Sequence, residues 1–258
     1  MLYYFVLLSL PPISFREKPE ISFADLKDRL YLNLSLRDRN RFASLMQPID
    51  LYNVRAFWLG QPLDDRGNVR AKELEEALLV RDNLPVYLSD YLERYETVSQ
   101  RLRHFSFLVA SLYREKIEEE RGFLRRYFQF ERELMLVLAA LRSKRTGVDI
   151  IKDLQFEDPS DPIVAYILSQ RDADVFTPPK EFEELKTLFE DHWGNPERLH
   201  RSILEYRLDR IEEMEQEDVP FSIDQILSYV AKFLIIDGWF RLDQIKGNLA
   251  VEGLSHYG

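Results

Sequence analysis

The chain has 258 residues, of which 35 are Lys or Arg and 45 are Asp or Glu, so its formal net charge is −10. An acidic chain repels phosphate, which argues against a nucleic-acid-binding protein that relies on a basic surface. The absence of cysteine excludes disulfides, thiolate zinc sites and a cysteine nucleophile, and it fits a cytoplasmic protein. Only 9 Gly are present and no glycine-rich phosphate-binding motif occurs, so the composition favours an all-α protein without a nucleotide site.

The most apolar stretch of the chain is its N-terminus, which ends at Pro11 and Pro12. Its length is about half of what a membrane-spanning helix needs. We expect this segment to pack on the core as a strand or a short helix, and its aromatic and β-branched residues favour the extended form. No other stretch is long and apolar enough to span a bilayer, so we expect a protein that does not cross a membrane.

Capping and stop signals divide the next part of the chain into short helices. Ser22 with Asp25 three residues later is typical of a helix start, and Ser35 and Asp50 take the cap position before two later helices. Pro48 cannot donate a backbone hydrogen bond, so we expect one helix to end before it. The predicted helices are 22–32, 36–46, 51–59, 71–80 and 85–95.

The strongest periodic pattern lies in the middle of the chain, where apolar residues alternate at spacings of four and three positions. This repeat predicts long helices that pack along their length as an antiparallel hairpin or bundle, and it favours an elongated molecule. Polar Lys116 and Glu119 interrupt the pattern just before Gly122. A helix over 98–141 therefore either bends there or extends past its packing partner into water. The apolar positions are Val98, Leu102, Phe105, Val109, Leu112, Phe123, Tyr127, Phe130, Leu134, Val137 and Leu141.

Proline-containing breaks divide the last part of the chain into further helices. Glutamate runs such as 212–218 are typical of solvated helix faces, and the alternative is an acidic docking face for a basic partner. The predicted helices are 163–170, 180–193, 197–216 and 222–242.

Three predicted helix ends look alike, because an Arg precedes a terminal Gly at Gly60, Gly147 and Gly247. This pattern is either an internal repeat or ordinary C-cap chemistry. We therefore treat 1–258 as one helical domain, which a true repeat would divide into the lobes 1–96, 97–158 and 159–258.

No motif in the sequence predicts catalysis. The histidines are His104, His192, His200 and His256, and Glu197–His200 is a single Glu-x-x-His without a second copy. We expect surface histidines, with no metal, no cofactor and no enzymatic activity. The alternative is an all-α enzyme with a carboxylate and histidine metal site around His192 and His200.

Several segments resemble the C subunit of the V-type and A-type ATP synthases, whose eukaryotic counterpart is the d subunit. These segments are 49–55, 84–92 and 131–147, and Asp50, Asn53 and Arg55 fit an Asp/Asn-Leu/Arg segment at the ends of that family's repeated helical units. The N-terminus, Tyr3 to Pro12, is similar to an uncharacterised bacterial family encoded within V-type ATP synthase operons. This second resemblance covers nearly the entire chain.

The resemblance implies a non-catalytic socket that couples the central stalk to the membrane rotor ring. Its partners would be the D and F subunits of the central stalk and the ring. Its location would be cytoplasmic, peripheral to the inner face of the membrane. The alternative is a generic α-helical adaptor with another partner. The residues assigned to partner contact or to the repeated motif are Asp50, Asn53, Arg55, Arg142, Arg145 and Arg241.

Overall fold

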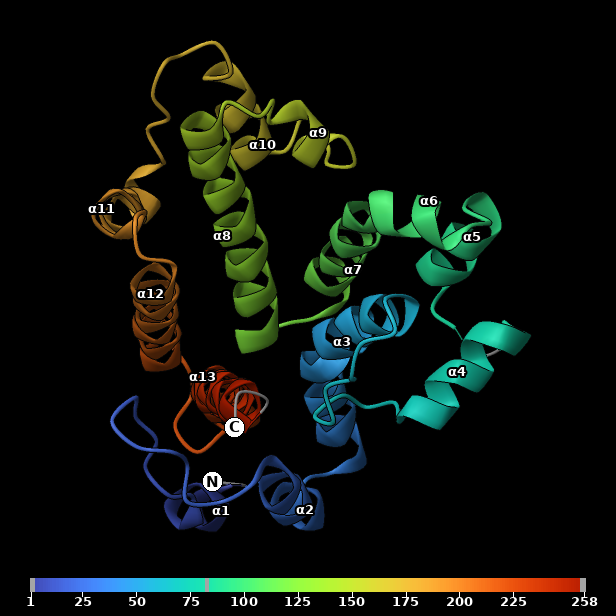
Figure 1. Ribbon diagram of the computed structural model, residues 1–258. Helices are drawn as coiled ribbons and strands as arrows, with labels where there is room; N and C mark the ends of the chain where they lie inside the picture. Colours follow the sequence, from blue (N-terminus) through green and yellow to red (C-terminus); the bar gives the residue numbers. More distant parts are fainter. Residues whose placement is uncertain (1–2, 82–83, 256–258) are drawn as a thin grey trace. The chain divides into compact units, whose positions relative to one another are not determined.

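The computed structural model describes the backbone of residues 3–81 and 84–255, with side chains up to Leu242. Within these residues the protein contains thirteen α-helices and one 3-10 helix, and no strand (Figure 1). The prediction of an all-α fold is confirmed. None of the helices in the described part of the chain combines the length and apolar character of a membrane span.

The described chain forms two compact units. The first contains both ends of the chain, residues 1–40 and 194–258, and the second is the continuous segment 41–193. The lobe limits that an internal repeat would place at 96/97 and 158/159 both lie within the second unit.

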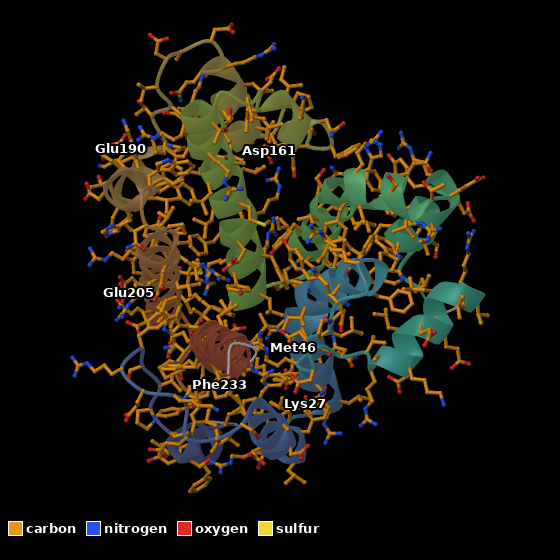
Figure 2. All side chains as sticks on the ribbon, viewed as in Figure 1. Lys27, Met46, Asp161, Glu190, Glu205 and Phe233 are labelled. Atoms are coloured by element: carbon orange, nitrogen blue, oxygen red, sulfur yellow. The ribbon has the colours of Figure 1, made fainter. Side chains whose placement is uncertain are left out.

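The first unit is built from the helices at the two ends of the chain. Its core includes Phe233, whose side chain is fully buried (Figure 2). The Tyr229 hydroxyl donates to the carbonyl of Pro11 at 2.8 Å, which ties the N-terminal segment to a C-terminal helix. The helices are α1 (Tyr4–Ser9), α2 (Phe23–Asn33), the start of α3 (Leu36–Trp58), α12 (Pro196–Gln216) and α13 (Ile223–Ser255), and α12 packs on α13.

The N-terminal segment is a short helix, so the preference for an extended form is wrong. Tyr3 and Val6 are both buried, and their spacing of three residues brings them to one face only if the backbone is helical. The Tyr3 hydroxyl also donates to the Asp38 carboxylate. These tertiary contacts outweigh the weak β-propensity of the segment.

Two predicted helix ends are wrong, because the helix-breaking residue at each of them, a proline or a glycine, did not end the helix. Helix α3 runs through Pro48, with Leu45 buried before it and Leu51 buried after it. Helix α13 continues through Gly247 to Ser255. A proline inside a helix costs about 3 kcal/mol and a glycine about 1 kcal/mol. Burial on both sides of Pro48 offsets the cost of the proline. The cost of a glycine is too small to end a helix by itself.

The second unit contains the rest of α3 and the remaining helices, and its central pair is α7 and α8, which pack against each other (Figure 1). The periodic segment 98–141 forms three helices. Of the two alternatives at Gly122, the structure has the bend: this glycine has a φ of 61°, a conformation that favours glycine. The helices are α4 (Ala71–Val80), α5 (Val86–Arg94), α6 (Val98–Arg103), α7 (Phe105–Glu119), α8 (Phe123–Thr146), α9 (Ile151–Leu154), α10 (Pro162–Ser169), the 3-10 helix η1 (Lys180–Phe182) and α11 (Glu183–His192).

Most of the other predicted helices are confirmed to within one residue at each end. This agreement follows from clear capping chemistry. Ser22 and Asp25 form a reciprocal capping box at the start of α2, and Asp161 caps α10 ahead of Pro162. Gly147 ends α8 in the left-handed conformation, with φ of 72°.

Candidate functional site

A cavity of about 600 Å³ lies in the second unit, between α3, the segment that follows it, α4 and α5. This volume is within the range of ligand-binding pockets. Most of the wall is apolar, and the polar lining residues are Gln47, Asp50, Asn68, Glu73, Glu76 and Tyr87.

The segment 60–70 forms one wall because two side chains of α3 bind its backbone. Asn53 Nδ2 donates to the carbonyl of Asp64 at 2.9 Å, and Asn53 Oδ1 accepts from the Asp64 amide at 2.8 Å. One turn earlier, Asp50 Oδ1 accepts from the backbone amides of Asn68 at 2.7 Å and Val69 at 3.2 Å. The loop is therefore anchored to the helix along its length.

This anchoring requires glycine at position 67. A Cβ there would lie 2.5 Å from Asp50 Oδ1 and 3.0 Å from Asn53 Nδ2, closer than real Cβ contacts. The close packing of the turn 64–67 against Asp50 and Asn53 therefore depends on this glycine. Asp50, which the sequence suggested as the N-cap of a separate helix, lies inside α3 and holds this loop instead.

Three of the residues assigned to partner contact lie on α3. Asn53 is 3% exposed and its amide is used inside the chain, so its structural role is to hold the loop. Asp50 lines the cavity while it accepts from Asn68. Arg55 is exposed, and its guanidinium lies 5.8 Å from the centre of the Phe105 ring. The structure therefore brings Asp50 and Asn53 together through one loop.

The other three assigned residues lie elsewhere. Arg142 and Arg145 are exposed in the last turns of α8, where cations suit the helix dipole, and Arg145 lines a second cavity of about 180 Å³. Arg241 belongs to α13 in the first unit, and its Nε donates to Asp237 at 2.7 Å.

Two polar groups of the large cavity are in unusual environments. Gln47 Oε1 is buried and accepts no hydrogen bond from any residue that the structure describes. The pKa of Tyr87 is raised, first by burial and then by the negative charges of Glu115 and Asp50. A buried acceptor without a donor is unfavourable.

The cavity opens beside an exposed apolar surface. Val80 lines the cavity and is 66% exposed, and its neighbour Leu79 is 75% exposed. Val86, which follows the lining residue Pro85, is 74% exposed. An exposed apolar side chain that lines an apolar cavity, as Val80 does, is typical of a surface that binds another molecule.

Comparison with known proteins gives a family for this chain. Residues 1–254 match the family described as Protein of unknown function (DUF2764). The chain belongs to this family. The expectation of an uncharacterised family is thereby confirmed.

Relatives of this DUF2764 protein occur in Chlamydia, and each is described as an uncharacterized protein. The relative in Chlamydia muridarum (strain MoPn / Nigg) is 32% identical over 239 residues, 90% of this chain and 90% of the relative. The relative in Chlamydia trachomatis serovar D is 31% identical over 261 residues, which cover 97% of this chain and 98% of the relative. No solved structure matches the chain. These matches name no partner, so the link to an ATP synthase stays a prediction.

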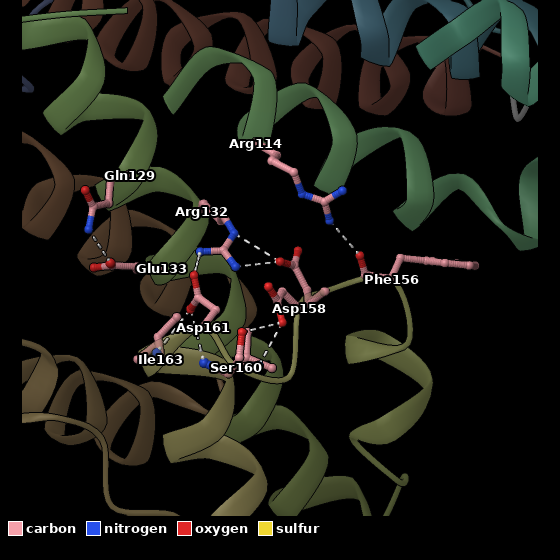
Figure 3. A network of polar contacts seen from close by, with 11 residues as sticks. Arg114, Gln129, Arg132, Glu133, Phe156, Asp158, Ser160, Asp161 and Ile163 are labelled. Carbon is pink, nitrogen blue, oxygen red and sulfur yellow. Dashed lines mark hydrogen bonds and ion pairs between the residues drawn. The ribbon is translucent and has the colours of Figure 1, made fainter. Parts of the chain in front are cut away.

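A second polar cluster of this DUF2764 protein is a buried ion network on α8 (Figure 3). Arg132 is 8% exposed, and it donates to Glu157 at 2.6 Å and to Asp161 at 3.1 Å. Asp161 also caps α10. Burial lowers the pKa of Arg132, but the two carboxylates outweigh burial and the net direction is upward. The network fastens the segment before α10 to α8, which is a structural role.

The histidines and carboxylates of the described chain form no group of three that could hold a metal ion. His192 ends α11 in the second unit, whereas His200 lies in α12 of the first unit. His256 lies outside the described residues.

The sequence did not indicate the cavity or the Arg132 network. Asp161 before Pro162 marks a helix start, but nothing local predicts its pairing with Arg132, 29 positions away. The polar residues 64–67 mark a loop next to the cavity. Its connection to Asp50 appears only when the loop folds back on α3.

Proposed function

We propose that this protein is a non-catalytic socket of a V-type ATP synthase, similar to the C subunit, which couples the central stalk to the membrane rotor ring. In this role it would bind the D and F subunits of the stalk and the ring, and it would lie peripheral to the inner face of the membrane. The proposal rests on the resemblance of segments 49–55, 84–92 and 131–147 to the C subunit.

The structural observation that supports a docking role is the large cavity with its exposed apolar mouth. Val80 and its neighbours leave apolar surface in water, which is unfavourable unless a partner covers it. The attachment of the loop by Asp50 and Asn53 keeps one wall of the cavity preformed, so less order is lost on binding.

Force transmission also needs elements that do not slide past one another. In the second unit, the Arg132 network ties the segment before α10 to α8. In the first unit, Glu215 of α12 accepts from both Ser228 and Lys232 of α13, at 2.9 Å and 2.6 Å. Such cross-links between helices suit a protein that carries a mechanical load.

The decisive experiment is native co-purification from cells that express the ATP synthase. Tagged protein should recover the D and F subunits of the stalk together with the rotor ring. A Val80→Asp variant, which places a charge at the cavity mouth, should recover less of the complex, whereas Glu93→Gln, an exposed change on α5, should not. Recovery of neither stalk nor ring with the unmodified protein would rule out the socket.

The second candidate is an α-helical adaptor with another partner, and the same apolar surface supports it. The co-purification separates the two. An adaptor would recover a constant set of proteins that lacks the stalk and the ring, and Val80→Asp would reduce that set.

A further inference from the structure

The cavity of the second unit combines apolar walls with acidic charge. Its lining includes Leu51, Leu74 and Leu88, which are nearly fully buried. The charged lining residues are all carboxylates, namely Asp50, Glu73 and Glu76, and both glutamates are exposed on α4. A ligand that suits this cavity therefore carries an apolar surface flanked by positive charge.

The roles of the three carboxylates differ. Asp50 is engaged by Asn68 at the base of the cavity, and Glu73 Oε2 accepts from the Arg70 amide at the start of α4. Glu73 keeps further acceptor capacity, since an ionised carboxylate has about four lone-pair sites. Glu73 and Glu76 are three residues apart on one helix, so they form one acidic edge.

The acidic edge also indicates which cation suits the cavity. A lysine or arginine side chain carries hydrogen-bond donors on a long apolar stem, so the stem can pack on the apolar wall while the charge reaches Glu73 and Glu76.

The volume of the cavity would suit a small molecule as well, and the exposed apolar side chain of Val80 at its edge favours a macromolecule. The cavity itself holds about 600 Å³, and Val80 carries the apolar lining outward into solvent beside Leu79. One face of an amphipathic helix presents apolar anchors at positions i, i+3 or i+4, and i+7, so it fills a groove and covers the adjoining surface.

We propose that this cavity binds a basic amphipathic helix of a partner protein. The apolar face of that helix packs against the leucine-lined wall, and its lysine or arginine side chains meet Glu73 and Glu76. This inference rests on the proposed docking function and names the chemistry of the partner element.

The test uses the purified full-length protein and two synthetic fluorescent peptides. Both are helical, with leucines at i, i+3 or i+4, and i+7. One carries lysines beside the leucine face, and in the other every lysine is replaced by glutamate. Fluorescence anisotropy should show that the lysine peptide binds at least about tenfold more tightly than the glutamate peptide.

The whole chain is acidic, so position-specific variants must separate the cavity from general attraction. The double variant Glu73→Gln with Glu76→Gln should weaken binding about fivefold, and glutamine at position 73 can still accept from the Arg70 amide. The matched control is Glu75→Gln, an exposed glutamate of α4 that does not line the cavity, and it should change binding far less.

Two further variants test the apolar walls. Ala77→Phe fills the cavity and should weaken binding about tenfold. Val80→Ser removes an exposed apolar contact without touching the core, so it serves if Ala77→Phe fails to fold. Circular dichroism and thermal unfolding establish which variants are folded.

Several results would overturn the inference. These are no binding of the lysine peptide, equal binding of both peptides, or unchanged binding by the folded cavity variants. If a small hydrophobic dye binds the wild type but not Ala77→Phe, while neither peptide binds, the cavity takes a small apolar ligand instead.

The same variants distinguish this inference from the proposed function. If Ala77→Phe and Val80→Ser still recover the stalk and the ring as the wild type does, the socket stands and the cavity is not its helix-binding site. If the wild type recovers neither but binds the lysine peptide at the cavity, the inference stands and the socket fails.

Discussion

At the scale of single residues, the second unit depends on buried charges that find partners inside the chain. Arg132 meets Glu157 and Asp161, and Lys116 Nζ, on a residue only 5% exposed, lies 2.8 Å from Glu119. A buried charge that loses its partner costs several kcal/mol, so each of these pairs fixes one local arrangement. Lys116, which looked like a break in an apolar pattern, is thus part of the interior.

Glu133 is a partly buried carboxylate whose titration we expect to measure. Its pKa is raised, first by burial, although the Gln129 amide donates to it at 2.9 Å. A folded-state pKa above the unfolded value means that stability falls as pH rises through the window between the two values. Glu133→Gln removes this penalty and keeps an acceptor for Gln129.

The variant Glu133→Gln should therefore melt about 2 °C above the wild type at neutral pH. The gain should vanish below about pH 4, where the carboxyl is protonated in both states. Thermal unfolding followed by circular dichroism at several pH values measures this difference. Glu118→Gln, an exposed change on α7, should show no such trend, and a constant gain at all pH values would contradict the explanation.

At the scale of elements, the same breaker residues act differently in different surroundings. Gly122 takes a positive φ where the chain turns, between the end of α7 at Glu119 and the start of α8 at Phe123. Gly247 lies inside α13, and Pro48 lies inside α3 between buried Leu45 and Leu51. Local propensity sets a cost of a few kcal/mol at most, and tertiary burial on both sides of a breaker can exceed it.

The loop 60–70 is an element whose position depends on α3, and Asn53→Ala tests this dependence. Removing the amide leaves the backbone amide and carbonyl of Asp64 without their partner, so we expect a loss of about 1–3 kcal/mol in the free energy of unfolding. Urea unfolding measures the loss, and hydrogen exchange should become faster at residues 64–69.

The control for this change is Gln61→Ala, an exposed position in the same loop, which should leave both stability and exchange close to wild type. Equal effects of the two substitutions would mean that Asn53 does not hold the loop.

At the scale of the whole molecule, the two compact units do not simply follow one another along the chain. The second unit is one continuous segment, whereas the first is assembled from both ends of the chain. The first unit therefore forms its long-range contacts only after the second has been synthesised, and its closure carries the larger entropy cost.

This division predicts which fragments fold. Residues 41–193 expressed alone should be helical and unfold cooperatively, because they contain a complete unit. The fragment 1–96 should not, because it contains part of each unit. Circular dichroism and urea unfolding of both fragments test this prediction. Cooperative unfolding of the fragment 1–96, together with a disordered fragment 41–193, would support the lobes suggested by an internal repeat.

The amino-acid sequence by itself determined the fold class and most helix limits. Capping residues such as Ser22 and Asp161 act on amides within the next few positions, so local chemistry suffices to predict them. At Gly122 it left two alternatives, a bend or a helix that extends past its partner.

The tertiary structure decided which residues that are distant in the sequence contact one another. Whether Pro48 ends a helix, whether Lys116 is in water, and whether Asp50 caps a helix or holds a loop all depend on contacts between distant positions. The cavity is the clearest case, because its walls come from α3, α4, α5 and a loop that Asn53 and Asp50 fold back. Local sequence sets the energies of short-range hydrogen bonds, but burial and pairing over long separations are set only when the helices pack.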